Sequence, residues 1–181
     1  MWIKDEDFIR GEVPMTKFAI RTLIVAALEP GKEEKILDIG AGTGSISVEL
    51  ATFGCDVISI DFEEKAVELI SKNAEKHGVK LRIIRGMAPS DLPREIFDKC
   101  FIGGSSGNLE DIFGYLESGL RTGGILAASF ITLKNLNEFK ELLKKHGYKK
   151  CETTLVQVSN ESAAGLLMGQ NPVFIVKGIK S

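Results

Sequence analysis

Two hydrophobic periodicities alternate along residues 31–147, and this alternation constrains the fold more than any other feature of the sequence. Short apolar runs typical of strands are separated by stretches in which apolar residues recur every three or four positions, as in helices. One helical stripe consists of Ile112, Leu116 and Leu120. We expect strands at residues 35–40, 55–61, 81–85, 98–102 and 124–130. Strands that alternate with helices of about 10–15 residues predict a parallel sheet with helices on both faces.

The last part of the chain departs from this alternation. Residues 150–158 and 173–177 have strand character, and no helix-length segment lies between them, so these two strands should be antiparallel. The long connection, residues 159–171, contains Gly-Leu-Leu-Met-Gly at 165–169 and is a candidate lid or subunit contact. The expected fold is therefore α/β, a doubly wound, seven-stranded mixed sheet of Rossmann-like type whose last strand pair is antiparallel.

The length of 181 residues predicts a single domain spanning residues 1–181. Its expected parts are an N-terminal segment with the first helix (1–30), a cofactor-binding βαβ core (31–147) and the C-terminal strand pair with its loop (148–181). The 23 basic and 25 acidic residues leave a net charge of −2, which argues against nucleic-acid binding. We expect no membrane partner, because no apolar run approaches the roughly 18 residues that span a bilayer.

The three cysteines are scattered and form no Cys-x-x-Cys or Cys/His cluster, so neither a disulfide framework nor a bound metal is expected. The N-terminus is acidic and lacks an apolar signal core, which predicts a cytoplasmic protein. His77 and His146 each lie between a lysine and a glycine at the end of an amphipathic stretch, a pattern typical of helix C-termini. Histidine-based catalysis is therefore not expected.

The strongest chemical signal is the glycine loop, Asp-Ile-Gly-Ala-Gly-Thr-Gly-Ser at residues 38–45, between the first strand and the next helix. The dinucleotide pattern GxGxxG would place its third glycine at Ser45, whereas the observed spacing is Asp-x-Gly-x-Gly-x-Gly. This spacing resembles motif I of class I S-adenosylmethionine-dependent methyltransferases. The carboxylate of Asp38 suits a ligand with an ammonium and a sulfonium group and would repel a pyrophosphate. An NAD(P)-dependent Rossmann oxidoreductase is the less favoured alternative.

Two further segments support a nucleotide site. Asp61, at the end of the second strand, can accept hydrogen bonds from ribose hydroxyls of either cofactor type. Residues 86–89 (Gly-Met-Ala-Pro) end the third strand, where an adenine ring would lie. After the fourth strand, residues 101–109 lack the Asn/Asp-Pro-Pro-Tyr/Phe pattern of methyltransferases that act on nucleic-acid amino groups.

A narrower resemblance begins at residues 11–17, Gly-Glu-Val-Pro-Met-Thr-Lys, with Arg21 one turn later. This segment resembles the N-terminal signature of the decarboxylating cobalt-precorrin-6B C15-methyltransferases. Four more pieces of that family match in order, and the resemblance covers roughly residues 8–136; the pieces are residues 37–45, 86–89, 101–105 and 131–135. The chain departs from the family twice. The loop Gly-Gly-Ser-Gly-Gly is Gly-Gly-Ser-Ser-Gly at 103–107, and an asparagine before the Ile-Thr pair is replaced by Ser129-Phe130.

The resemblance implies the class I methyltransferase fold and methylation of C15 of cobalt-precorrin-6B by S-adenosylmethionine, with loss of carbon dioxide from the C12 acetate. The product would be cobalt-precorrin-8, in anaerobic cobalamin (vitamin B12) biosynthesis, and the assembly a homotetramer. A methyltransferase acting on another small molecule is the main alternative. The resemblance also implies a set of cofactor contacts: Thr16, Gly40, Ala41, Gly42, Thr43, Gly44, Asp61 and Ala88.

A tetrapyrrole substrate carries many carboxylates, so basic side chains are expected to bind it. We predict that Lys17 and Arg21 hold substrate carboxylates; the alternative is that both are solvated surface residues. Ser105 and Ser106 are further substrate-side candidates by position, and the sequence identifies no catalytic proton donor. Thr16 could instead cap the helix expected at residues 17–28.

Overall fold

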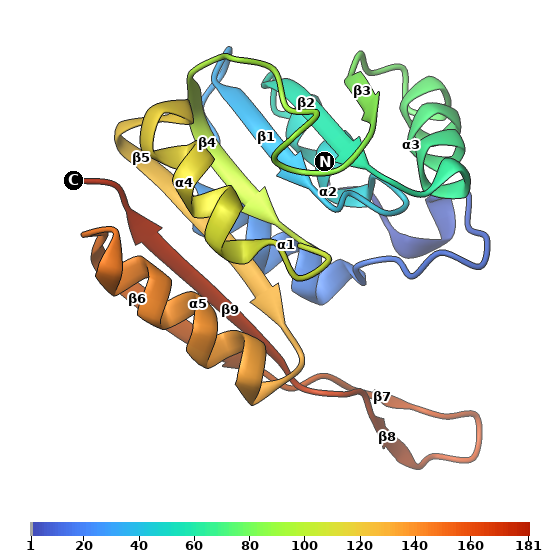
Figure 1. The fold of residues 1–181 in the computed structure, drawn as a ribbon. Coiled ribbons are helices and arrows are strands. Elements are labelled where there is room, and N and C mark those ends of the chain that lie inside the picture. The colour runs from blue at the N-terminus through green and yellow to red at the C-terminus, as the bar shows by residue number, and fades with distance from the viewer. Residues whose placement is uncertain (1) are drawn as a thin grey trace.

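The computed structural model describes residues 2–181 and contains a seven-stranded sheet in the order β3-β2-β1-β4-β5-β9-β6 (Figure 1). The first five strands are parallel, and β9 runs antiparallel to both of its neighbours, β5 and β6. The prediction of a mixed sheet with an antiparallel last strand pair is confirmed. The strands of this sheet are β1 (Lys35–Ile39), β2 (Asp56–Asp61), β3 (Arg82–Arg85), β4 (Phe97–Ile102), β5 (Leu120–Phe130), β6 (Lys149–Val156) and β9 (Val173–Ile179).

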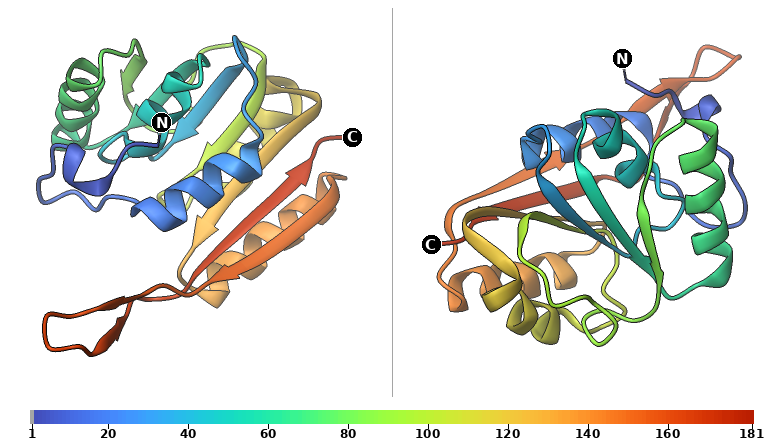
Figure 2. Two further views of the ribbon diagram at one scale, coloured as in Figure 1. Left: turned by 180° about the vertical axis from the view of Figure 1, so that it is seen from behind. Right: turned by 90° about the horizontal axis from the view of Figure 1, so that it is seen from above.

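Helices cover both faces of the sheet (Figure 2). Helices α1 and α2 pack on one face, α4 and α5 pack on the other, and α3 lies beside α2 at the β3 edge. The helical elements are η1 (Asp5–Asp7), α1 (Phe18–Leu28), α2 (Ser45–Thr52), α3 (Glu64–Lys76), α4 (Leu109–Gly119) and α5 (Leu133–Lys145). None of the helices within residues 2–181 has the length and apolar character needed to cross a membrane.

Strand β1 shows how this layering follows from the sequence. Ile36 packs on the α1–α2 side, whereas Leu37 and Ile39 pack on the α4–α5 side. Because both faces are covered, the strand is apolar almost throughout, as in other buried parallel sheets. Asp38 interrupts this run on the α2 side, and its partner in the sheet register, Ser59 of β2, is also polar. This polar pair lies at the start of the glycine loop, which forms part of the candidate active site.

The start of β5 differs most from the prediction, since β5 begins four residues before residue 124, whereas the other strand boundaries lie within two residues of the predicted ones. Leu120 was assigned to the helical stripe of Ile112 and Leu116, but α4 ends at Gly119 and β5 begins at Leu120. Leu120 pairs with Phe97 of β4, and the register shifts between Phe97 and Lys99. All members of the stripe are buried in the same core cluster. The periodicity was therefore a correct signal of burial, and pairing with β4 decided the backbone conformation.

The connection predicted as a loop contains a second, two-stranded sheet, formed by β7 (Ser159–Glu161) and β8 (Leu167–Gly169). We call residues 159–169 the hairpin. It extends away from the body of the seven-stranded sheet (Figures 1 and 2). Leu166, Leu167 and Met168 are 63%, 75% and 59% exposed, so this hairpin carries three adjacent apolar side chains with little cover.

Both histidines occupy the predicted helix ends. His77 is the C-cap residue of α3 and His146 that of α5. The glycine that follows each one, Gly78 and Gly147, has a positive φ, as C-terminal caps require. The His146 ring nitrogen Nδ1 lies 2.9 Å from Oε1 of Glu117. Neither histidine lines the main cavity.

Candidate active site

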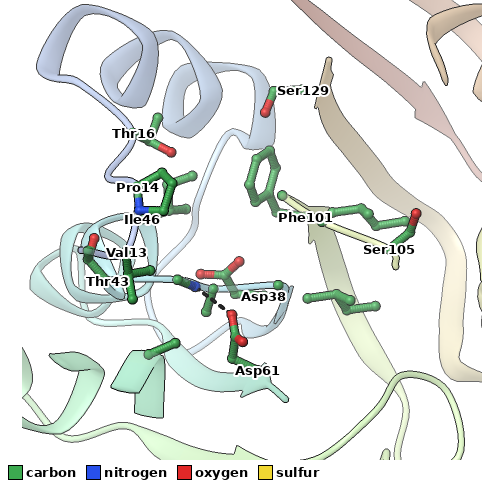
Figure 3. Close-up of a pocket in the computed structure, with 18 of the residues that line it drawn as sticks. Val13, Pro14, Thr16, Asp38, Thr43, Ile46, Asp61, Phe101, Ser105 and Ser129 are labelled. Carbon is green, nitrogen blue, oxygen red and sulfur yellow. Dashed lines mark hydrogen bonds between the residues drawn. The ribbon is translucent and has the colours of Figure 1, made fainter. Parts of the chain in front are cut away.

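A cavity of about 570 Å³ lies at the carboxyl ends of β1, β2 and β4 (Figure 3). The strand order reverses between β1 and β4, and doubly wound sheets bind their ligands at this switch point. Segments from the whole length of the chain contribute to the wall: residues 13–17, 38–43, 60–63, 86–88, 101–106 and 129–131, together with Ile20, Ile46, Ala66, Asn135, Gln170 and Val173.

The glycine loop rests directly on the backbone of the segment that follows β4. Gly40 has φ of 68°, and a Cβ atom there would lie 2.6 Å from the backbone nitrogen of Gly104. Gly103 donates its N–H to the carbonyl of Ile39 at 2.8 Å. A side chain at Gly40 would therefore force the two segments apart. This contact explains why glycines occur both in the loop and after Phe101-Ile102.

Gly44 was predicted to contact the cofactor, but it does not line the cavity. It is the N-cap residue of α2, with φ of 75°, and a Cβ atom there would lie 3.1 Å from the backbone of Ile70 in α3. Its role in this structure is to let α2 begin close to α3. The other predicted loop residues, Gly40, Ala41, Gly42 and Thr43, all line the cavity.

Asp61 connects the end of β2 to the glycine loop. Its Oδ2 atom accepts the N–H of Gly42 at 2.8 Å (Figure 3), and its Oδ1 atom accepts the N–H of Glu63 at 3.0 Å. The side chain is largely buried and lines the cavity. Each carboxylate oxygen has a further lone pair, so Asp61 can hold the loop and still accept hydrogen bonds from ligand hydroxyls.

Two buried polar atoms of the cavity wall have no hydrogen-bond partner within residues 2–181: Oδ1 of Asp38 and Oγ1 of Thr43. Each residue is 1% exposed. A buried polar atom without a partner costs about 1–3 kcal/mol, so both atoms favour a polar ligand in the cavity. Burial raises the pKa of Asp38 from 3.8 to about 7, opposed by a hydrogen bond from Ser47. A cofactor with an ammonium group fits this wall, because it supplies a partner and a positive charge for Asp38.

The N-terminal segment forms one side of the cavity, and Thr16 and Lys17 both line it. Lys17 is the N-cap residue of α1, and no side chain caps this helix. The alternative reading of Thr16 as the capping residue is therefore wrong, and its side chain remains available to a ligand. Lys17 is exposed and lines the cavity, so a charged substrate can reach it.

Arg21 does not line the cavity, and its burial contradicts the prediction that it binds a substrate carboxylate. The side chain is 0% exposed. Its guanidinium donates to Oε2 of Glu49 at 3.0 Å, to Oδ1 of Asp5 at 3.0 Å and to backbone carbonyls, including that of Thr16 at 2.8 Å. Arg21 therefore anchors the N-terminal segment across α1 and α2, and this segment in turn carries Thr16 and Lys17.

Ala88, Ser105 and Ser106 line the cavity as well. Ser106 adopts φ of 49°, in the left-handed region that favours glycine. The family loop described above has a glycine at this position. Ser106 replaces that glycine and keeps a backbone conformation that glycine adopts easily. Ser105 lies across the site from Thr16 (Figure 3).

The structure adds residues that sequence reasoning did not select. Phe62 directly follows Asp61, so its position next to the acidic end of β2 could have identified it as a site residue. Asn135 lies in the matched segment 131–135, so the resemblance could have identified it. Gln170 comes from the connection between the hairpin and β9, and no local pattern marked it. Within residues 2–181, no group of three or more His, Cys, Asp or Glu side chains could hold a metal ion.

The fold and the site together define the chain as a class I, Rossmann-like S-adenosylmethionine-dependent methyltransferase. The family model described as "Precorrin methyltransferase domain" matches residues 7–179. This chain therefore belongs to the precorrin methyltransferase family.

Relatives and a solved structure agree with this membership. A protein of Saccharolobus solfataricus named "Probable cobalt-precorrin-6B C(15)-methyltransferase (decarboxylating)" is 38% identical, over 98% of this chain and 95% of its own. A Salmonella typhimurium protein named cobalt-precorrin-6B C(15)-methyltransferase (decarboxylating) is 33% identical, over 96% of this chain and 94% of its own. The crystal structure of precorrin-6y C5,15-methyltransferase from Geobacter metallireducens superimposes with a TM-score of 0.91, at 28% identity, over 100% of this chain and 98% of that one.

Proposed function

We propose that this chain transfers a methyl group from S-adenosylmethionine to C15 of cobalt-precorrin-6B and removes carbon dioxide from the C12 acetate, giving cobalt-precorrin-8 in anaerobic cobalamin biosynthesis. The observation that carries the proposal is one cavity lined by two chemically different sets of side chains. Asp38, Asp61 and Glu63 are an acidic set suited to a cationic cofactor. Lys17, together with hydroxyl and amide side chains, forms the other set, which suits a substrate rich in carboxylates.

On the cofactor side, Thr16, the glycine loop, Asp61 and Ala88 would hold S-adenosylmethionine. When bound, this co-substrate supplies a methyl group on a sulfonium whose leaving group is already activated. Asp38 offers a carboxyl group to the ammonium, Asp61 offers acceptors to the ribose, and Phe62 with Met87 and Ala88 provides apolar cover for the adenine. These contacts orient the reacting group, and orientation contributes several kcal/mol to such a transfer.

On the substrate side, Lys17 would pair with a carboxylate of the macrocycle. Asn135 and Gln170 line the same cavity and can donate hydrogen bonds to further carboxylates. Phe130 and Ile131 supply an apolar surface for the flat ring. The conjugated macrocycle is itself the nucleophile and can absorb the electron pair left by decarboxylation, so the protein needs no activated cysteine or serine. Ser105 and Ser106 remain candidates for handling a proton.

We also propose that the whole chain works as one cytoplasmic unit that assembles into a homotetramer, with the hairpin as a subunit contact. The hairpin extends away from the sheet (Figure 1), and Leu166, Leu167 and Met168 are exposed together there. Such an apolar cluster on a projecting element is typical of an interface between subunits. A second copy of this chain is the partner that the family resemblance implies.

The decisive experiment is incubation of the protein with methyl-labelled S-adenosylmethionine and cobalt-precorrin-6B, followed by mass spectrometry. We expect the product to gain one methyl group and lose one carbon dioxide. Lys17→Ala should raise KM for the tetrapyrrole with little change in affinity for S-adenosylhomocysteine, whereas Asp61→Ala should weaken cofactor binding first. Binding of S-adenosylhomocysteine without any change in the tetrapyrrole would instead indicate a methyltransferase for another small molecule.

A further inference from the structure

Behind the glycine loop, three buried polar side chains form a hydrogen-bonded chain. The Ser59 hydroxyl donates to Oγ of Ser47 at 2.7 Å, and the Ser47 hydroxyl donates to Oδ2 of Asp38. Ser47 and Ser59 are 0% exposed, and Asp38 is 1% exposed. These hydrogen bonds therefore run from Ser59, buried in the protein core, to the carboxyl group of Asp38 in the cavity wall.

The fold brings these residues together from three elements. Asp38 of β1 and Ser59 of β2 are direct partners in the sheet register. Ser47 is the third residue of α2, the helix that the glycine loop begins. The two serines occupy positions that would ordinarily be apolar in a core between sheet and helix. Their presence there requires a reason beyond packing.

The arrangement satisfies one oxygen of Asp38 and leaves the other free. Oδ2 accepts from Ser47, whereas Oδ1 has no partner within residues 2–181 and belongs to a cavity-lining residue. An ionised carboxylate that is buried with one unpaired oxygen is costly, so burial favours the protonated acid when no cofactor is bound. A cation next to Oδ1 reverses this preference, because it pairs with the charged form.

The other charged and titratable groups near Asp38 do not supply that cation. Asp61, at the end of β2, raises the pKa of Asp38 through its negative charge. Cys100 of β4 is buried, which raises the pKa of its thiol. Glu49, on α2, is paired with Arg21 of α1. Of the cavity-lining residues, Lys17 is the basic one, and it lies on the N-terminal segment.

We propose that Ser47, supported by Ser59, is a positioning residue that fixes Asp38 with one oxygen toward the cavity, so that binding of the cofactor's ammonium group expels a proton from Asp38. The step balances: the O–H bond of the acid breaks, its electron pair stays on the carboxylate, the proton passes to solvent, and the carboxylate pairs with the ammonium. This inference rests on the proposed function, because it requires an amino-acid-bearing cofactor in the cavity.

The test is isothermal titration calorimetry of S-adenosylhomocysteine between pH 6 and pH 8, in buffers of different ionisation enthalpy. Since the pKa of Asp38 in the empty site is about 7, we expect release of about half a proton per site at pH 7, more at pH 6 and little at pH 8. Adenosine, which lacks the ammonium group, should bind without releasing a proton.

Variants separate positioning from simple structural support. Ser47→Ala removes a hydrogen bond that lowers the pKa of Asp38, so proton release should persist to higher pH and affinity at pH 8 should fall. Ser59→Ala should have the same effect at smaller amplitude. Asp38→Asn should bind S-adenosylhomocysteine weakly and release no proton. The matched control is Thr52→Ala, which removes a hydroxyl group from the same helix outside the cavity lining and should keep the wild-type proton count.

Three results would overturn the inference. The first is S-adenosylhomocysteine binding to the wild-type protein with no proton release, which would leave the proposed function intact. The second is a Ser47→Ala protein that folds and keeps the wild-type pH profile. The third is a wild-type protein that binds no S-adenosylhomocysteine at all, which would overturn the proposed function as well. If Ser47→Ala fails to fold, the comparison of S-adenosylhomocysteine with adenosine on the wild-type protein decides alone.

Discussion

Lys17 and Arg21 are one helical turn apart, yet they have opposite roles. Lys17 is exposed and lines the cavity, whereas the guanidinium of Arg21 is buried against Glu49, Asp5 and backbone carbonyls. The Phe8 ring also lies 4.7 Å from the guanidinium carbon. Burial therefore distinguishes the roles of two residues that look equivalent as substrate ligands in the sequence.

Replacing Arg21 should lower stability, whereas replacing Lys17 should weaken substrate binding. Arg21→Met leaves Glu49 buried without its partner, so we expect the free energy of unfolding to fall by roughly 3–5 kcal/mol. Lys17→Met should change stability by no more than about 0.5 kcal/mol, since Lys17 is exposed, and should weaken tetrapyrrole binding. Urea denaturation and substrate titration measure the two effects. Normal stability of Arg21→Met would contradict the anchoring role.

Asp38 should make the stability of the empty protein depend on pH. Burial raises the folded-state pKa of Asp38 to about 7, above its unfolded value near 3.8. The folded state therefore holds a proton that the unfolded state has lost, so the stabilisation is complete below about pH 4 and is lost as pH rises to about 7. At about 1.4 kcal/mol per pKa unit, the loss is of the order of a few kcal/mol.

Asp38→Asn removes this titration and provides the comparison. Its stability relative to the wild-type protein should rise between pH 4 and pH 7 and then level off, as measured by denaturation without cofactor. The carboxylates whose pKa is lowered by ion pairs, such as Glu34, are common to both proteins and cancel in the difference. A stability difference that does not vary with pH would show that Asp38 is not buried as an acid.

Among the secondary-structure elements, the hairpin is the one that the sequence pattern predicts least well. Its strands β7 and β8 are three residues each and exposed throughout, so no burial pattern marks them in the sequence. Pairing across the turn, with Ser159 opposite Gly169, creates them. The apolar residues that the sequence did reveal are solvent-exposed here and find cover in the proposed tetramer.

A charge in the hairpin should therefore change the assembly and not the fold of the subunit. Leu167→Asp should lower the mass found by light scattering after gel filtration, because a carboxylate would be buried in the proposed interface. Circular dichroism and S-adenosylhomocysteine affinity should stay close to wild type. Ala163→Asp, at the exposed turn of the same hairpin, is the matched control. An unchanged mass for Leu167→Asp would favour the lid alternative.

At the scale of the whole molecule, the cavity joins the N-terminal segment, four strand ends and the start of β9. A ligand that bridges these parts binds the folded state alone and must stabilise the chain as a unit. S-adenosylhomocysteine at 100 times its Kd should add about 2.7 kcal/mol, or roughly 5–10 °C in Tm for a chain of this size. NAD(P) should give no shift in the same thermal scan. A shift in Tm with NAD(P) and none with S-adenosylhomocysteine would instead support the oxidoreductase alternative.

Local sequence patterns are enough to predict the layered sheet, the two histidine caps and the glycine loop. These features depend on local chemistry: the period of apolar residues, glycines where φ is positive, and cations at helix ends. The loop residues Gly40 and Gly42 and the acid Asp61 could be assigned to the site for the same reason, since strand ends of a parallel sheet meet at one edge.

Which polar residues are buried, and what surrounds them, follows only from the packing of the folded chain. Burial excluded Arg21 from the site, Gln170 reached the cavity from a distant connection, and Asp38 was linked to Ser47 and Ser59 across three elements. No local pattern contains this information. The charge state and partners of a side chain depend on solvent exclusion by residues far away in the chain, and that exclusion exists only once the fold is complete.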